Sequence, residues 1–96
     1  MIVVRGTYTA PLAEVDAVRA DHLAWVTPHV EAGRVIAAGR DADATGSVVL
    51  FSGTDPDAAL ALLREDPYVQ GAVASYEVAA VFTPVVHADG FAPFTT

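Results

Sequence analysis

An arginine and a histidine lie three residues apart in the segment "RADHLAW", residues 19–25. The apolar residues around this segment recur with a helical period, at Leu12, Val15, Leu23, Val26 and Val30. With Leu12 set at 0° and about 100° per residue, Arg19 falls near 340° and His22 near 280°, inside the apolar stripe. Asp21 falls near 180°, on the opposite side. The pattern therefore predicts a helix that turns Arg19 and His22 toward the protein core.

A charged side chain on an apolar helix face costs free energy unless it has a partner. His22 has two interpretations of equal weight: a buried, hydrogen-bonded core histidine, or a histidine placed for chemistry. Arg19 has a simpler explanation, because its long aliphatic part can carry the guanidinium to the helix edge. His22 is therefore the stronger candidate for a catalytic residue.

A carboxylate in an unusual place is predicted in the segment "EDPY", residues 65–68. Asp55 and Pro56 have the residue types that begin a helix, and Pro67 is predicted to end it. Asp66 would then lie at the helix C-terminus, where the macrodipole disfavours it by about 0.3–1 kcal/mol. Asp-Pro is also a common way to start a turn. The functional alternative is that His22 or Arg19 partners Asp66; with His22 it would form a general acid/base dyad.

The composition excludes several classes of chemistry. With no cysteine there is no disulfide, thiol nucleophile or thiolate metal site, and with no lysine there is no Schiff base. The spacing of His22 and His29, two helical turns, is too long for ready chelation of one ion, so we expect no metal and no cofactor. A net charge of −7 argues against a nucleic-acid partner.

The length and the hydropathy predict a single domain over residues 1–96. The chain has 96 residues, of which 53% are hydrophobic, enough to build a core. No apolar run approaches the roughly 18 residues of a membrane span, so no membrane association is expected. The N-terminus lacks a signal-peptide pattern, and we therefore expect a cytoplasmic protein.

The order of predicted elements defines the fold class. Strands are predicted at 2–9, 34–39, 47–53 and 73–82, and helices at 12–32 and 56–66. This order is typical of an α+β, ferredoxin-like fold, with a four-stranded antiparallel sheet and two helices on one face. Residues 84–96, with two prolines and a glycine, are predicted to form a C-terminal arm.

The sheet face without helices is predicted to be covered. The segment "VVLF", residues 48–51, is apolar on both sides of its pleat. The last strand offers Tyr76, Val78, Ala80 and Phe82 to one face and Ala79 and Val81 to the other. In a sheet with one solvent-exposed face, apolar and polar residues alternate more regularly along each strand. We therefore expect a homodimer in which a second subunit covers this face.

Four segments, "RADHLAW", "EAGRVIAAG", "GSVVLF" and "EDPYVQGAVASYEV", together resemble the YCII-related (YciI-like) domain family. The resemblance covers the chain up to about Phe82. It implies a dimeric α/β barrel related to muconolactone-isomerase-like proteins, and a site at a histidine and an aspartate, which match His22 and Asp66. One activity in the group is dehydrochlorination of a chlorinated hydroxyquinol. Many relatives have proline after the Ala-Gly, where this chain has Arg40, so their substrates do not transfer directly.

The first functional hypothesis is a small lyase or isomerase that needs no cofactor. His22 would move a proton on a small, cyclic or aromatic substrate, and Asp66 would orient the imidazole. Arg19 or Arg40 would hold an anionic group or an enolate oxygen. The remaining polar residues predicted to line the pocket are Ser47 and Tyr68.

The second hypothesis is a non-catalytic dimeric binding or assembly module, in which His22 and Asp66 form a structural pair. A weaker third possibility is haem chemistry. A concave cavity that reaches His22 would favour the enzyme, whereas a sealed pair would favour the module.

Overall fold

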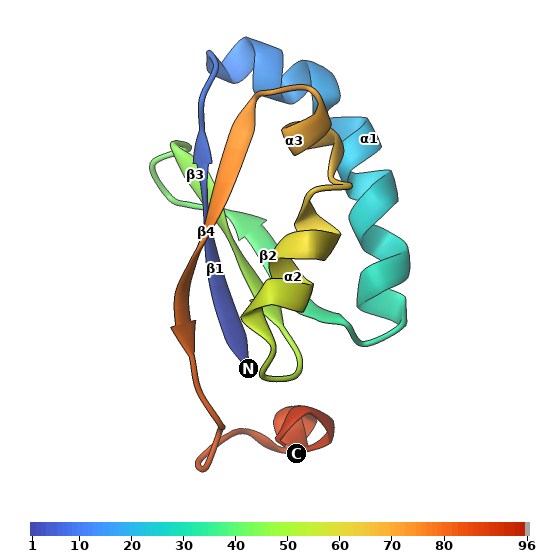
Figure 1. Cartoon of the computed structure of the whole chain (residues 1–96), viewed down its shortest axis with the longest axis vertical. Coiled ribbons are helices and arrows are strands. Elements are labelled where there is room, and N and C mark those ends of the chain that lie inside the picture. Colours follow the sequence, from blue (N-terminus) through green and yellow to red (C-terminus); the bar gives the residue numbers. More distant parts are fainter. Residues whose placement is uncertain (96) are drawn as a thin grey trace.

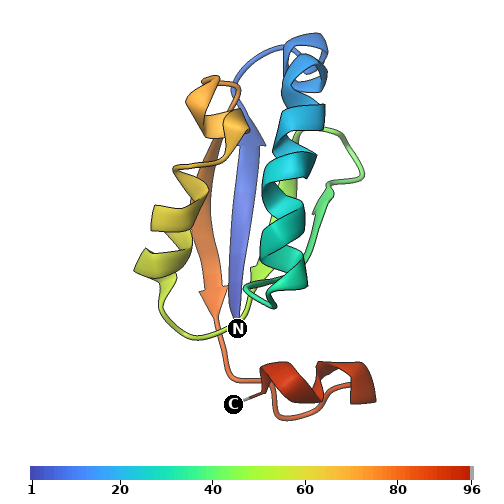
Figure 2. The same cartoon turned by 90° about the vertical axis from the view of Figure 1, so that its right-hand side faces the viewer.

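The computed structural model describes residues 1–95. In chain order its elements are β1 (Ile2–Tyr8), α1 (Leu12–Glu31), β2 (Val35–Arg40), β3 (Gly46–Phe51), α2 (Pro56–Leu63), α3 (Pro67–Gln70), β4 (Ala74–Val81) and the 3₁₀ helix η1 (Asp89–Phe94). The strands form one antiparallel four-stranded sheet in the order β2-β3-β1-β4. All three α-helices cover one face of this sheet, and α1 lies beside α2 and α3 (Figures 1 and 2). The predicted α+β ferredoxin-like fold is therefore confirmed.

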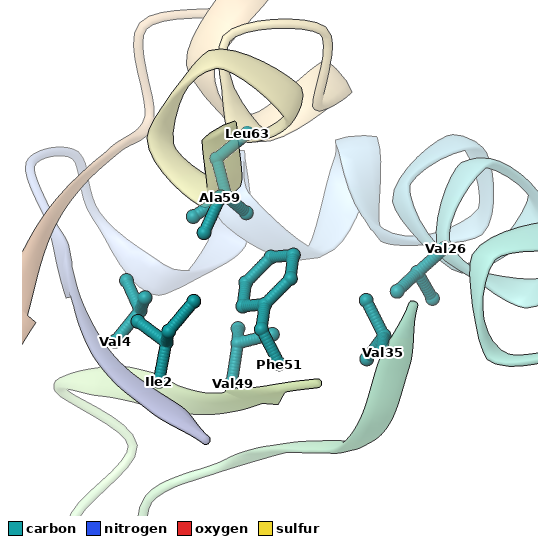
Figure 3. Close-up of a cluster of buried hydrophobic side chains, with 8 residues drawn as sticks. All are labelled: Ile2, Val4, Val26, Val35, Val49, Phe51, Ala59 and Leu63. Atoms are coloured by element: carbon teal, nitrogen blue, oxygen red, sulfur yellow. The ribbon is translucent and has the colours of Figure 1, made fainter. Parts of the chain in front are cut away.

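The main core lies between the sheet and the helix layer (Figure 3). Its buried members are Ile2, Val4, Val26, Val35, Val49, Phe51, Ala59 and Leu63. Burying an aliphatic or aromatic side chain of this size contributes about 1.5–3 kcal/mol relative to leaving it exposed. A second cluster lies under α3 and the first half of α1, and its buried members are Val15, Tyr68, Val73 and Ala74.

The buried face of α1 is rotated from the one that the apolar stripe predicts. Leu12, Leu23 and Val30 have exposed fractions of 41, 48 and 43%, while Val15 and Val26 are buried. The His22 side chain has an exposed fraction of only 12%, and Val18, Trp25 and His29 are also partly buried. Arg19 is exposed. The prediction that Arg19 turns toward the core is therefore wrong, because the helix packs through the side that carries His22.

The predicted second helix is in fact two helices. α2 ends at Leu63, and backbone bonds from Glu65 N to Leu62 O and from Asp66 N to Leu63 O close a turn after it. Pro67 does not end a helix; it begins α3, since proline suits the first helical position. Asp66 is extended, as a residue before proline prefers to be, and it caps α3. The inference that Asp66 stands at an unfavourable helix C-terminus is therefore wrong.

A register shift changes which face part of β4 presents. β1 pairs with β4 at Val4–Val78 and then at Val3–Ala80, so Ala79 is an extra residue in β4. Val3 and Val4 point to opposite faces of the sheet, and paired residues share a face. Ala80 therefore lies on the helix-free side with Val3, and the prediction that it shares a face with Val78 is wrong.

Residues after β4 leave the sheet and form η1 below it, near the N-terminus (Figure 1). Val85 and Val86 there have exposed fractions of 86 and 94%. A β-carbon placed at Gly33 would lie 3.8 Å from the Phe94 ring, so η1 reaches the end of α1. Residue 96 of the predicted arm lies outside the described residues. No helix in the described part of the chain is long and apolar enough to cross a membrane.

The substitution Asp55→Ala should lower the free energy of unfolding by about 1 kcal/mol. Asp55 Oδ1 accepts hydrogen bonds from Asp57 N and Ala58 N, at 3.1 and 3.2 Å, and so caps α2. Urea denaturation followed by circular dichroism would measure the change. Asp43→Ala, at an exposed loop position, is the control and should change stability by less than about 0.5 kcal/mol. Equal effects of the two substitutions would contradict the assignment of Asp55 as the cap.

Candidate active site

A fully buried carboxylate, that of Asp66, is the centre of the site; its exposed fraction is 0%. Asp66 Oδ1 lies 2.7 Å from His22 Nδ1 and accepts a bond of 2.9 Å from Tyr68 N. Asp66 Oδ2 accepts a bond of 2.6 Å from the Tyr76 hydroxyl. These partners come from α1, α3 and β4. They compensate for the hydration that an ionised carboxylate loses on burial.

The contact with Asp66 determines how His22 can act. An ionised carboxylate only accepts hydrogen bonds, so a contact with ionised Asp66 assigns a proton to His22 Nδ1 and leaves Nε2 as the nitrogen that can exchange a proton with a ligand. Within residues 1–95 Nε2 makes no hydrogen bond, and every buried polar side-chain atom there has a partner. Nε2 is therefore accessible to solvent. The Tyr68 ring stacks on the imidazole, with centroids 3.9 Å apart and planes 5° apart, and fixes the ring plane.

Tyr76 belongs to the site, although the sequence analysis did not select it. Burial, followed by the hydrogen bond to Asp66, raises the pKa of Tyr76, which keeps its hydroxyl a donor. Its ring crosses β1 at Gly6, its partner in the β1–β4 register. A β-carbon at Gly6 would lie 2.7 Å from Tyr76 Cε1 and 2.6 Å from Ser47 Oγ. Gly6 is therefore needed for Tyr76 to reach Asp66.

A cleft of about 170 Å³ opens between α1 and the strands β2 and β3. Its polar or aromatic lining residues are Tyr8, Arg19, His22, Arg40, Ser47 and Tyr68. Its other lining residues are Leu23, Val26, Val30, Ala38, Gly39 and Val49. Every predicted site residue except Asp66 thus lines one cleft, and Asp66 lies behind His22. The exposed side of α1 found above, with Leu23 and Val30, forms one wall of this cleft.

Arg40 joins β2 to α1 at one end of the cleft. Its Nε donates to the Tyr8 hydroxyl at 2.9 Å and its Nη2 donates to Asp16 Oδ1 at 2.5 Å. The guanidinium carbon also lies 5.4 Å from the Tyr8 ring centroid. The bond to Asp16, followed by that to Tyr8, raises the pKa of Arg40. Tyr8, which the sequence analysis also missed, therefore helps to hold this arginine in place.

The other two histidines are engaged elsewhere. His29 Nδ1 accepts a bond of 3.0 Å from Arg34 Nε, and His87 is exposed in the segment after β4. Across residues 1–95, no group of three or more histidine, cysteine, aspartate or glutamate side chains is arranged to hold a metal ion. His22 is therefore the histidine that the fold brings to the cleft.

Comparison with known proteins supports the family resemblance. The YCII-related domain family matches residues 1–82. Among solved structures, the chain is similar to 5-chloro-2-hydroxyhydroquinone dehydrochlorinase from Burkholderia phenoliruptrix, in complex with 2,5-dihydroxybenzoquinone. The TM-score is 0.66 at 19% identity, covering 88% of this chain and 96% of that one, which shows a shared fold. No curated protein sequence matches the chain.

The substitution Tyr76→Phe should lower the free energy of unfolding by about 1–3 kcal/mol, because Asp66 Oδ2 would lose its donor in a buried place. Urea denaturation would measure this loss. Tyr68→Phe makes the same chemical change on a buried ring whose hydroxyl makes no hydrogen bond within residues 1–95, so it should cost less than about 0.5 kcal/mol. A Tyr76→Phe protein as stable as Tyr68→Phe would show that the Tyr76–Asp66 bond contributes little.

Proposed function

Because the chain belongs to the YCII-related domain family, we propose that it is a small-molecule enzyme of the lyase or isomerase type, with His22 as general acid/base and Asp66 as the residue that orients it. One observation carries this proposal. His22 is anchored through Nδ1 by a fully buried carboxylate, and the same ring lines an open cleft. A structural histidine–aspartate pair has no need of a cleft with converging polar side chains.

The proposed reaction begins with a proton transfer to His22. His22 Nε2 would take a proton from an acidic C–H or phenolic O–H of the substrate, and Asp66 would stabilise the imidazolium that forms. Charge that develops on a substrate oxygen would lie near the arginines of the cleft, Arg19 and Arg40. In an isomerase, the protonated ring would return its proton to another carbon of the substrate. In a lyase, the electron pair of the broken C–H or O–H bond would expel an anionic leaving group, and the imidazolium would release its proton to water.

The cleft has the size of a small substrate. An engineered apolar cavity of about 150 Å³ binds benzene, and the cleft here measures about 170 Å³. The similar dehydrochlorinase is named for a chlorinated hydroxyhydroquinone and was solved with a dihydroxybenzoquinone. Both compounds have one oxygenated six-membered ring. We therefore take a single-ring compound as the substrate of this chain, with Ser47 and Tyr68 as further polar contacts.

The substitution His22→Ala should reduce turnover by about 10²–10⁴-fold, the usual contribution of a general acid/base. 5-Chloro-2-hydroxyhydroquinone and its unchlorinated and methylated analogues are the first substrates to assay, with chloride release and absorbance as readouts. His29→Ala is the matched control, because His29 is not among the cleft residues. A His22→Ala protein that is fully active but about 3 kcal/mol less stable would identify His22–Asp66 as a structural pair.

We also propose that the enzyme is a homodimer through the helix-free sheet face. Val3 pairs with both Leu50 and Ala80, and Val48 lies next to them on β3 with an exposed fraction of 41%. These side chains form an apolar patch on the face opposite the helices. A second copy that packs its own sheet there would remove the patch from water.

Light scattering should give twice the chain mass of 10.0 kDa, and Val48→Glu should shift the protein toward the single-chain mass. A carboxylate at this position lies opposite Arg5 across the β1–β3 pair, and the loss of hydration on burying these charges in the interface would disfavour association. Ala61→Glu adds the same charge on the exposed side of α2 and should leave the mass unchanged. A wild-type mass near that of one chain would refute the dimer.

A further inference from the structure

Positive charge is scarce in this protein but gathers at one cleft. The chain has 5 arginines and no lysine against 12 acidic residues. Two of these arginines, Arg19 and Arg40, line the cleft, and no carboxylate appears among its lining residues. A cleft wall that is locally positive on an acidic protein is suited to an anionic ligand.

Two carboxylates, those of Asp16 and Asp66, form hydrogen bonds with residues that line this cleft. Asp16 accepts a bond from Arg40 Nη2, so that pair is close to neutral. Asp66 has an exposed fraction of 0% and accepts bonds from His22, Tyr68 and Tyr76. Asp16 lies three residues before Arg19 on α1 but forms its salt bridge with Arg40, and neither carboxylate forms a salt bridge with Arg19.

Arg19 and Arg40 consequently differ in what they can offer a ligand. Arg40 is held by both Asp16 and the Tyr8 hydroxyl, and its charge is balanced. Arg19 is exposed, and within residues 1–95 it forms no salt bridge. The unbalanced positive charge of the cleft wall is therefore that of Arg19, which can offer a carboxylate two parallel N–H groups.

The position of Arg19 relates this charge to the proposed acid/base residue. Arg19 and His22 are three residues apart on α1, so their β-carbons lie about 5–6 Å apart on one side of the helix. Both side chains line the same cleft. An anionic group bound by Arg19 would place an attached ring within reach of His22 Nε2.

We propose that the cleft binds small single-ring compounds bearing one carboxylate, and that Arg19 is the residue that binds this carboxylate. The inference deepens the proposed function, because it names the substrate class of the same site. Arg40 acts as a fixed wall that limits the length of the ligand. A neutral ring of equal size would lose the charge-assisted bonds to Arg19 and bind more weakly.

Two probes of matched size test this inference: 2,5-dihydroxybenzoate and 2,5-dihydroxybenzamide. NMR titration of the full chain, followed at the His22 ring and the arginine side chains, would give both affinities. The benzoate should bind about tenfold more tightly than the benzamide at low salt, with a smaller ratio as sodium chloride rises. Arg19→Gln should reduce the ratio to below about twofold. Arg64→Gln, at an arginine outside the cleft, should preserve it.

Equal affinities for the two probes would overturn the inference, as would a preference that survives Arg19→Gln or the absence of saturable binding by either probe. The titration measures no turnover. A protein that prefers the benzoate but has no His22-dependent activity would therefore support the carboxylate site while refuting the acid/base proposal. The reverse result would refute the carboxylate site alone.

Discussion

The site depends on the burial of one ionisable group, the carboxylate of Asp66. An ionised carboxylate removed from water loses several kcal/mol of hydration, which only well-aligned donors can offset. Here the donors are His22 from α1, the Tyr68 backbone N–H from α3 and the Tyr76 hydroxyl from β4. Two helices and a strand must therefore meet at one point. The position of each is constrained by the same three bonds.

Local features of the chain allow α1, α3 and β4 to converge at Asp66. Asp66 is held extended by Pro67 and caps the first turn of α3, which separates it from α2 and turns its carboxylate toward α1. Because Gly6 has no side chain, the Tyr76 ring can lie over β1 and reach Asp66. The face of α1 that carries His22 packs inward, and this rotation leaves Leu23 and Val30 along the cleft instead of in the core.

The fold could be predicted from the sequence because strand and helix periods are local signals. The pairing of His22 with Asp66 could also be anticipated, although part of the reasoning was wrong: Asp66 caps α3 instead of ending α2. Tyr76 and Tyr8 were not selected, since a strand period shows which face a residue shares but not what lies opposite it. The true orientation of α1 could not be read from its apolar residues, because some of them line a cleft and are only partly buried.

An open apolar cleft costs stability, since the same side chains could be buried by a closer approach of α1 to the sheet. Two kinds of contact hold the walls apart. At one end Arg40 spans from β2 to Asp16 on α1 and to Tyr8 on β1, and this combination limits how the helix can tilt. Val26, which also lines the cleft, packs with Val35 in the main core (Figure 3). An exposed ion pair alone contributes little, but with the Tyr8 bond and the core contact it fixes the helix on two sides. These contacts therefore maintain the cleft. Leaving Leu23 and Val30 partly exposed along it costs stability, and such a cost is typical of a protein that keeps space for a ligand.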